Sequence, residues 1–160
     1  MQDKKGEHPL GDAGQLMLFG LFLITWVLDS FFLQRSTFLA HSIPLVIRLI
    51  FLATALLAAF ILFKSGHAAV IGEQRPSRII STGAFGYVRH PLYLGSILVY
   101  LGLTVSTASL FCLVLLPVIA LFYNYIAGYE EKRMEAKFGQ AYIAYRLHTG
   151  KWLPRFGKKG

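Results

Sequence analysis

The sequence contains few charged residues and a single cysteine. Of its 160 residues, 15% are charged and 55% are hydrophobic, and the mean hydropathy is +0.54. A soluble domain of this size needs more polar surface than this. Cys112 cannot form a disulfide within the chain, and because it lies in an apolar run we predict a small buried side chain. The composition favours a single membrane domain over residues 1–160.

Four apolar segments are long enough to cross a bilayer, whose core takes about 20 residues of helix. They run approximately over residues 15–33, 43–63, 91–107 and 110–127. Because lipid offers no partner for free backbone groups, these segments must be helices. The first follows a polar stretch and has no small-residue cleavage site, so we expect a retained span and no signal peptide. Residues 106–109 are too few for a polar loop, and Gly95 and Gly102 permit close helix approach.

The prediction is therefore an all-α, polytopic membrane bundle of about four transmembrane helices, with a tight hairpin between the third and fourth. An even number of spans places both termini and the middle loop on one side. That side carries fourteen of the sixteen Lys and Arg residues, so the preference of basic residues for the inside makes it cytoplasmic. These residues are Lys4, Lys5, Lys64, Arg75, Arg78, Arg89, Lys132, Arg133, Lys137, Arg146, Lys151, Arg155, Lys158 and Lys159.

Two charged residues fall inside predicted spans. Asp29 lies in the first and Arg48 in the second, each about five residues from the loop that joins them. A charge in lipid is costly unless it is paired. We therefore expect Asp29 and Arg48 to form an ion pair that fixes the helix contact, with a role in substrate passage as the alternative.

The sequence has no zinc-ligand spacing, phosphate-binding P-loop or dinucleotide-binding glycine pattern, and no metal is expected. The topology already explains the basic charge. No nucleic-acid partner is needed, and anionic lipid headgroups are the expected partner of the basic side.

The polar segment over residues 81–95 has features of a small binding site. Gly83 and Gly86 allow unusual backbone conformations, and Pro91 suits the first position of a helix. His90 is then expected at the N-cap of the third span, where free backbone N–H groups attract an anionic group. Tyr93 lies one turn further in. From the residues alone, an interfacial anchor with an aromatic belt is an equal alternative.

A second polar segment, over residues 129–146, follows the fourth span. Glu130 and Glu131 lie where this span leaves the bilayer, beside a basic surface. The aromatic residues that follow recur at helical spacing, which predicts a cytoplasmic amphipathic helix on the membrane surface. Gly139 is expected to divide the helix. Ordinary solvated helix charges are the alternative explanation of the two glutamates.

Taken together, these motifs resemble the isoprenylcysteine carboxyl methyltransferase family, which includes phospholipid N-methyltransferases. The resemblance covers residues 79–155, about half of the chain. Its signature has two departures here, Gly83-Ala84-Phe85 in place of Gly-Pro-Tyr and Met134 in place of a leucine, and both keep the apolar character. The ordered elements are Arg89-His90-Pro91-Leu92-Tyr93-Leu94-Gly95, Glu130-Glu131, Phe138-Gly139, Tyr142, Tyr145 and Trp152-Leu153-Pro154.

The resemblance implies a methyltransferase that uses S-adenosyl-L-methionine, with residues 66–160 as the cofactor-binding core and residues 1–65 as two N-terminal spans. His90 and the start of the third span would hold the cofactor carboxylate, and Glu130 or Glu131 its amine or ribose hydroxyls. Glu131 and Arg146 are the implied catalytic residues, with Glu131 as the proton acceptor for an amine. The implied cofactor-binding residues are Gly83, Tyr87, Arg89, His90, Tyr93, Gly95, Glu130, Glu131 and Tyr145.

The expected acceptor is a lipophilic small molecule or a lipidated substrate: an isoprenylcysteine-like carboxylate, a phospholipid amine or a small thiol. The expected location is the bacterial inner membrane, with both termini cytoplasmic. Two other functions stay open, an NADPH-dependent enzyme similar to sterol reductases and a non-catalytic membrane binding subunit.

Overall fold

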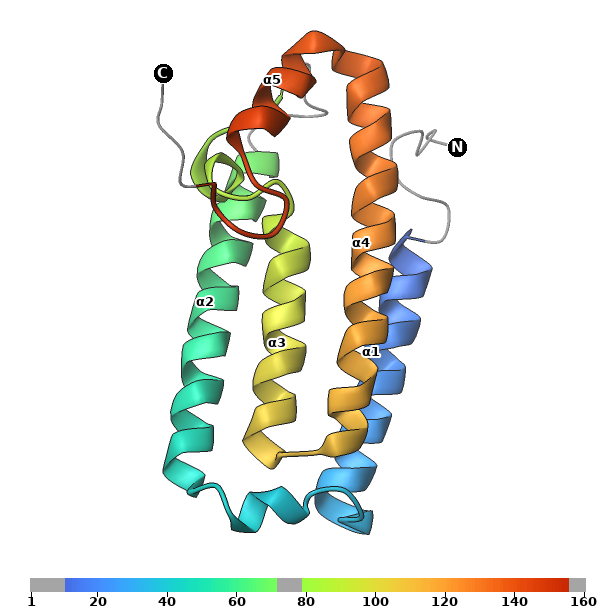
Figure 1. Ribbon diagram of the computed structural model, residues 1–160, viewed down its shortest axis with the longest axis vertical. Coiled ribbons are helices and arrows are strands. Elements are labelled where there is room, and N and C mark those ends of the chain that lie inside the picture. The colour runs from blue at the N-terminus through green and yellow to red at the C-terminus, as the bar shows by residue number, and fades with distance from the viewer. Residues whose placement is uncertain (1–10, 72–78, 156–160) are drawn as a thin grey trace.

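The computed structural model describes residues 11–71 and 79–155, which form an upright bundle of helices (Figure 1). In the described part of the chain there is no β-strand. The main helices are α1 (Gly11–Val27), α2 (Leu45–Ile71), α3 (Pro91–Thr107), α4 (Leu110–Phe138) and α5 (Gln140–His148). A π-helical turn (Leu28–Leu33) extends α1, and short 3₁₀ turns form at Phe38–His41 and Gly83–Gly86.

Three helices in this part of the chain are long and apolar enough to cross a membrane: Gly11–Leu33, Leu45–His67 and Leu110–Phe138. The fourth apolar helix, α3, has 17 residues, which is the lower limit for a spanning helix. Only Ala108 and Ser109 separate α3 from α4. The predicted helical bundle and its tight hairpin are confirmed.

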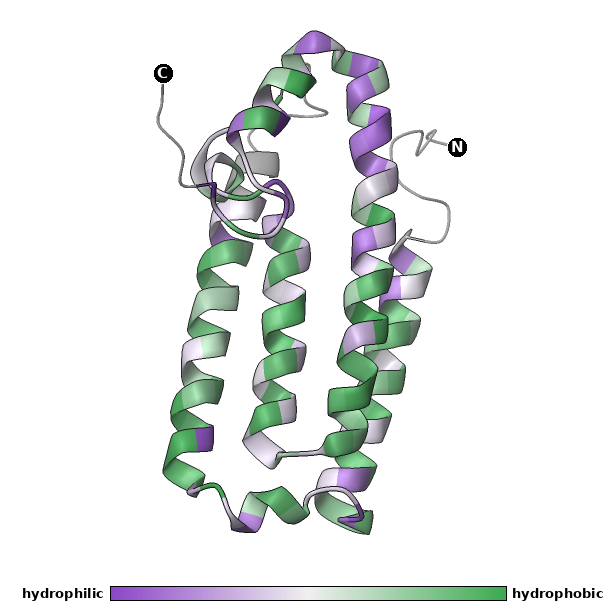
Figure 2. Cartoon of the chain, viewed as in Figure 1, coloured by the Kyte–Doolittle hydropathy of each residue, from purple (hydrophilic) through white to green (hydrophobic). Residues whose placement is uncertain are grey.

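The helix α4 is longer than the predicted span, with 29 residues. Because a bilayer core needs only about 20 of them, we take residues 110–127 as its membrane-spanning part. Residues 128–138 carry six charged side chains, and this end of α4 is hydrophilic in Figure 2. Gly139, with φ of 56°, ends α4 and α5 turns back from it, so the predicted division at this glycine is confirmed.

Small residues bring α2 and α3 close together. A Cβ added at Gly102 would lie 3.0 Å from the Cβ of Ala55, and one added at Gly95 would lie 3.0 Å from the ring of Phe63. These contacts confirm the close helix approach predicted at the two glycines.

The buried core joins α1, α3 and α4, and its residues are Phe22, Tyr100, Cys112, Ile119 and Tyr123. Cys112 is free and fully buried, as its apolar surroundings predicted.

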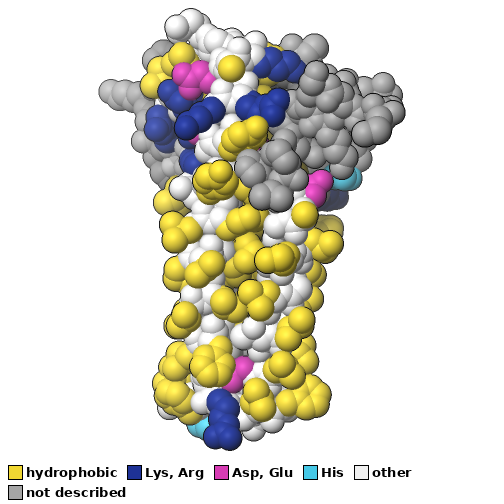
Figure 3. Space-filling model, turned by 90° about the vertical axis from the view of Figure 1, so that its right-hand side faces the viewer, with side chains coloured by type: hydrophobic (Ala, Val, Ile, Leu, Met, Phe, Trp, Pro, Cys, Tyr) yellow, Lys and Arg dark blue, Asp and Glu magenta, His cyan; other side chains and the backbone are white. Residues whose placement is uncertain are grey.

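Charged side chains gather at one end of the molecule. On the face shown in Figure 3, Lys and Arg side chains cluster above a long belt of hydrophobic side chains. The helix α5 and the start of α3 lie at this end in Figure 1, and the link from α1 to α2 lies at the opposite end. Several basic residues used to predict the topology lie outside the described residues: Lys4, Lys5, Arg75, Arg78, Lys158 and Lys159.

The predicted ion pair between Asp29 and Arg48 is wrong. Asp29 is 1% exposed and accepts hydrogen bonds from the backbone N–H of Ser36 at 3.0 Å and from the hydroxyls of Ser36 and Ser109. Arg48 instead donates to backbone carbonyls, including that of Ser106 at 2.6 Å. Ser106 lies in the last turn of α3, where unpaired carbonyls attract a cation. Two hydroxyls and a backbone N–H therefore satisfy the carboxylate, and backbone carbonyls of the end of α3 and of the segment before α2 satisfy the guanidinium.

Candidate functional site

Local backbone geometry places His90 at the start of α3. The preceding turn begins at Gly83, whose φ of 59° favours glycine, and the N–H of Ala84 donates to the hydroxyl of Ser65 at 2.8 Å. Pro91 occupies the first turn of α3, and His90 is the N-cap with no side-chain capping bond. The predicted cap position is confirmed, and the imidazole is left to face other groups.

Arg89 ties the C-terminal segment to this turn. Its side chain is 7% exposed and donates to the Glu131 carboxylate at 3.0 Å. It also donates to the carbonyls of Arg146 and Thr149, and its own N–H donates to the carbonyl of Gly150 at 2.8 Å. A buried guanidinium has to be paired in this way, so Arg89 joins three segments that lie far apart in the sequence.

His90 lies between the two glutamates of α4. Its Nε2 is 3.0 Å from a carboxylate oxygen of Glu131, and its Nδ1 is 3.6 Å from one of Glu130. The hydroxyl of Tyr93 donates to the other oxygen of Glu130, and the His90 and Tyr93 rings are parallel with centroids 5.7 Å apart. We expected His90, at the start of α3, and the two glutamates of α4 to lie in one site. The structure confirms that these side chains are neighbours.

Glu131 and the nearby phenols have perturbed acidities. Burial raises the pKa of Glu131, but the hydrogen bonds from His90 and Arg89 outweigh burial and leave this pKa below its usual value. Burial raises the pKa of Tyr145 to about 12, despite the opposing charge of Arg89. Glu131 is therefore an anion at neutral pH, within hydrogen-bond distance of Arg89 and His90, and Tyr145 is a neutral hydrogen-bond donor.

A cavity of about 500 Å³ borders this cluster, and we call it the polar cavity. The backbone N–H groups of Leu92 and Tyr93, the first free donors of α3, have no hydrogen-bond acceptor among the described residues. Such free donors at a helix start favour an anionic group. Its lining residues are Gly11, Asp12, Gln15, Phe63, Phe85, Arg89, His90, Pro91, Leu92, Tyr93, Ser96 and Glu130.

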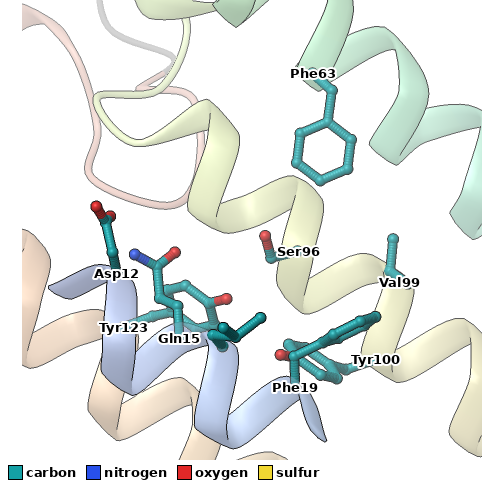
Figure 4. A pocket seen from close by; sticks show the side chains of 9 residues that line it. Asp12, Gln15, Phe19, Phe63, Ser96, Val99, Tyr100 and Tyr123 are labelled. Carbon is teal, nitrogen blue, oxygen red and sulfur yellow. The ribbon is translucent and has the colours of Figure 1, made fainter. Parts of the chain in front are cut away.

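A second cavity of about 500 Å³ lies deeper between the helices, and we call it the apolar cavity (Figure 4). Four residues line both cavities, so the two adjoin: Asp12, Gln15, Phe63 and Ser96. The others lining the apolar cavity are Leu16, Phe19, Val99, Tyr100 and Tyr123.

Four of the predicted site residues line the polar cavity: Arg89, His90, Tyr93 and Glu130. Two others support its wall without lining it. Gly95 packs against the ring of Phe63, and the hydroxyl of Tyr145 donates to the carbonyl of Phe85 at 2.7 Å.

The remaining predicted residues do not line either cavity. Glu131 lies behind His90 and Arg89, and Arg146 forms an ion pair with Glu135 at 2.7 Å. Tyr87 is 69% exposed, and Gly83 lies against Ser65. The catalytic roles of Glu131 and Arg146 stay predictions, and the geometry around Glu131 is that of a residue that positions His90 and Arg89.

The sequence motifs missed the contribution of the first two helices. Asp12 and Gln15 of α1 and Phe63 of α2 line both cavities. Asp12 and Gln15 are three residues apart, on one face of the helix. Two polar side chains on one face at the end of a span were the only signal, and ordinary interfacial residues share it.

Among the described residues, no group of three or more His, Cys, Asp or Glu side chains is placed to hold a metal ion.

Comparisons with known proteins give two matches. The model of the phospholipid methyltransferase family matches residues 45–141, which is more than half of the chain. The chain is 28% identical to a methanethiol S-methyltransferase of Crocosphaera subtropica (strain ATCC 51142 / BH68), over 95% of this chain and 55% of that protein. The chain therefore spans about half the length of this curated relative. No solved structure matches.

Proposed function

Because the chain belongs to the phospholipid methyltransferase family, we propose that it is a membrane methyltransferase, which transfers a methyl group from S-adenosyl-L-methionine to a lipophilic acceptor. We place the reaction at the cytoplasmic face of the membrane, where both termini would lie. The family assignment confirms the resemblance seen in the motifs. The cofactor, the acceptor and the membrane face are parts of the proposal.

The single observation that supports this function best is the meeting of complementary groups in the polar cavity. The cofactor is a nucleoside that carries a carboxylate, an amine, a ribose diol and a sulfonium cation. The free N–H groups of Leu92 and Tyr93 suit the carboxylate, and the carboxylate of Glu130 suits the amine or the diol. A volume of about 500 Å³ lies in the usual range for small-ligand pockets. The residues present therefore fit the cofactor, which when bound supplies an electrophilic methyl group.

The residues around the cavity would position this ligand. Glu131, with Arg89 and His90, forms a network with low exposure, in which the side chains of Arg89 and Glu131 are 7% and 12% exposed. Such a network holds His90 in one orientation beside Tyr93 and Glu130. Proximity and alignment are the main requirements of a displacement on a methyl carbon, and a rigid wall supplies both.

The apolar cavity would bind the body of the acceptor. Its lining is mainly aromatic and aliphatic, and its residues come from the apolar helices α1, α2, α3 and α4. An acceptor held there would meet the cofactor where the two cavities adjoin. Burial of the apolar body excludes water from the reacting groups.

Titration calorimetry on the purified protein in lipid nanodiscs tests the cofactor assignment. S-Adenosylhomocysteine is expected to bind and NADPH is not. Glu130→Gln should weaken S-adenosylhomocysteine binding by about 10- to 100-fold, since a charge-assisted hydrogen bond contributes about 1.5–3 kcal/mol. Glu135→Gln is the matched control, because Glu135 lies on the same helix and pairs with Arg146 outside the cavity. Binding of NADPH alone, or of neither ligand, would contradict the proposal.

A further inference from the structure

Residues 149–155 follow α5 and turn back against α4 and the turn before α3, and we call them the C-terminal clamp. Figure 1 shows this segment, in dark red, turning back from α5 beside the start of α3. The backbone N–H of Arg89 donates to the carbonyl of Gly150 at 2.8 Å, and the Arg89 side chain donates to the carbonyl of Thr149. A Cβ added at Gly150 would collide with the carbonyl oxygen of Leu153. The clamp is therefore a tight turn that requires glycine at this position and is fixed to Arg89.

Asn124 of α4 anchors the C-terminal clamp. Its side-chain oxygen accepts hydrogen bonds from Nζ of Lys151 at 2.8 Å and from Nε1 of Trp152 at 3.3 Å. Its backbone carbonyl accepts a second bond from Lys151 at 3.1 Å. Asn124 and Glu131 lie two helical turns apart, on the same face of α4. Both residues therefore contact the segments around His90, although neither lines a cavity.

Trp152 carries this anchoring to His90. The indole and imidazole ring centroids are 5.8 Å apart, and the indole also packs against the buried core of the bundle. His90 lines the polar cavity, whereas Trp152 lines neither cavity. A side chain that contacts His90 outside the cavity can influence a ligand only through the position of the imidazole.

The imidazole of His90 depends on such contacts because it makes no capping bond with α3. Its Nε2 lies 3.0 Å from Glu131, but a single short hydrogen bond leaves the ring plane free to turn. The ring contacts with Tyr93 and Trp152 restrict this rotation. Of these two rings, only Tyr93 lines the polar cavity, so Trp152 supports the imidazole without taking part in the cavity wall.

We propose that Trp152, held by Asn124, is a positioning residue that fixes the ring plane of His90 for ligand binding in the polar cavity. The identity of that ligand rests on the proposed function. The orientation of His90 does not rest on it, because the contacts that carry it lie within the protein.

The reactivity of His90 toward diethyl pyrocarbonate, in the ligand-free protein in nanodiscs, tests this orientation. The modified peptides are measured by mass spectrometry, and the exposed His41 of the opposite end is the internal reference. His90 is 9% exposed and should react slowly in the wild type. Trp152→Leu keeps apolar bulk but loses the ring and its N–H, and should raise the His90 rate by about fivefold or more through local opening. Asn124→Leu leaves the indole without its anchor and should raise the rate by about twofold.

The matched control is Trp26→Leu. Trp26 is the other tryptophan of the chain, and its Nε1 likewise donates to an oxygen, the carbonyl of Leu103 at 3.0 Å, toward the opposite end of the bundle. This change should lower the melting temperature and leave the His90 rate as in the wild type.

S-Adenosylhomocysteine affinity, measured by calorimetry, gives the second readout. Trp152→Leu should weaken binding by about tenfold or more, and Trp26→Leu should leave it within about twofold of the wild type. Trp152→Phe keeps a ring beside the imidazole and should restore the affinity to within about threefold of the wild type.

An unchanged His90 rate in folded Trp152→Leu, or an equal loss of affinity in Trp152→Leu and Trp26→Leu, would overturn the inference. If Trp152→Leu does not fold, Asn124→Leu decides by the same two readouts, and wild-type values in both would overturn it. A wild type that binds no S-adenosylhomocysteine would refute the proposed function, and the His90 rates would still decide whether Trp152 orients the imidazole.

Discussion

Two polar clusters lie near opposite ends of the bundle, and they differ in how far the protein satisfies its own polar groups. We call them the Asp29 cluster (Asp29, Ser36 and Ser109) and the His90 cluster (Arg89, His90, Tyr93, Glu130 and Glu131). Each contains a carboxylate in a largely apolar molecule. In the Asp29 cluster one backbone N–H and two hydroxyls donate to a carboxylate that is 1% exposed. Neither cavity is lined by any of its three residues.

The His90 cluster borders a cavity on one side. Arg89 and His90 bind Glu131 behind the cavity, whereas Glu130, with its side chain 27% exposed, faces the cavity itself. The free N–H groups of Leu92 and Tyr93 lie beside it. A polar cluster with no open side holds helices together, and one with free donors beside a cavity can bind a ligand. The first cluster therefore has a structural role, and the second is the candidate site.

The largest expected effect comes from Glu131→Ala in the His90 cluster. The change leaves the buried Arg89 without its carboxylate partner and frees His90 to turn, and breaking a buried pair costs about 3–5 kcal/mol. S-Adenosylhomocysteine affinity, measured by calorimetry, should fall more than 100-fold. His90→Ala should have an effect of similar size, while Glu135→Ala should leave the affinity within about twofold of the wild type, a change of less than about 0.5 kcal/mol. If both His90→Ala and Glu131→Ala bind S-adenosylhomocysteine as tightly as the wild type, the cofactor site is not at the His90 cluster.

The second-largest effect is expected from Asp29→Ala, which should lower the stability of the protein without weakening ligand binding. Asp29→Ala leaves the Ser36 N–H and the hydroxyls of Ser36 and Ser109 without their acceptor, at about 1 kcal/mol each. The free energy of unfolding, measured in nanodiscs, should fall by about 2–3 kcal/mol, with S-adenosylhomocysteine affinity retained. Ser30→Ala, which removes a single hydroxyl bond to Thr107 nearby, is the control and should cost about 1 kcal/mol. Loss of ligand binding in a folded Asp29→Ala protein would show that the Asp29 cluster is more than structural.

The smallest effect is expected from alanine substitutions at two glycines of α3, Gly95 and Gly102, which should differ in ligand affinity. An added methyl at Gly102 meets Ala55, and one at Gly95 meets the ring of Phe63, which lines both cavities. Both Gly→Ala changes should lower the free energy of unfolding by about 1–2 kcal/mol through overpacking. Only Gly95→Ala should also weaken S-adenosylhomocysteine binding, by about threefold to tenfold, or about 1 kcal/mol. Equal ligand affinities in the two variants would contradict the place of Phe63 in the site wall.

Local signals in the sequence predicted the elements they control. The position of Pro91 gave the start of α3 and the cap at His90, and Gly139 gave the end of α4. The spacing of the motif residues led to the meeting of His90 with Glu130 and Glu131. These features depend on backbone preferences or on a signature within residues 79–155.

Features that depend on packing between distant segments could not be predicted. The partners of Asp29 come from a turn and from the hairpin tip, and short hydroxyl side chains there carry no sequence signal. Asp12 reaches the site because α1 packs against α4 and α3, which no motif in the first span indicates. The sequence predicted a helix over residues 129–138 but did not show that the fourth span continues into it without a break, since hydropathy marks the apolar part of a helix and not its end.

Photochemical crosslinking compares the two clusters most directly. Labelled S-adenosylmethionine is irradiated with the protein in nanodiscs, and the labelled peptides are identified by mass spectrometry. We predict label on residues 89–96 or on the peptide that contains Glu130, and its loss when excess S-adenosylhomocysteine is present. Label confined to the segment from Asp29 to Arg48, or label that S-adenosylhomocysteine does not displace, would contradict the account.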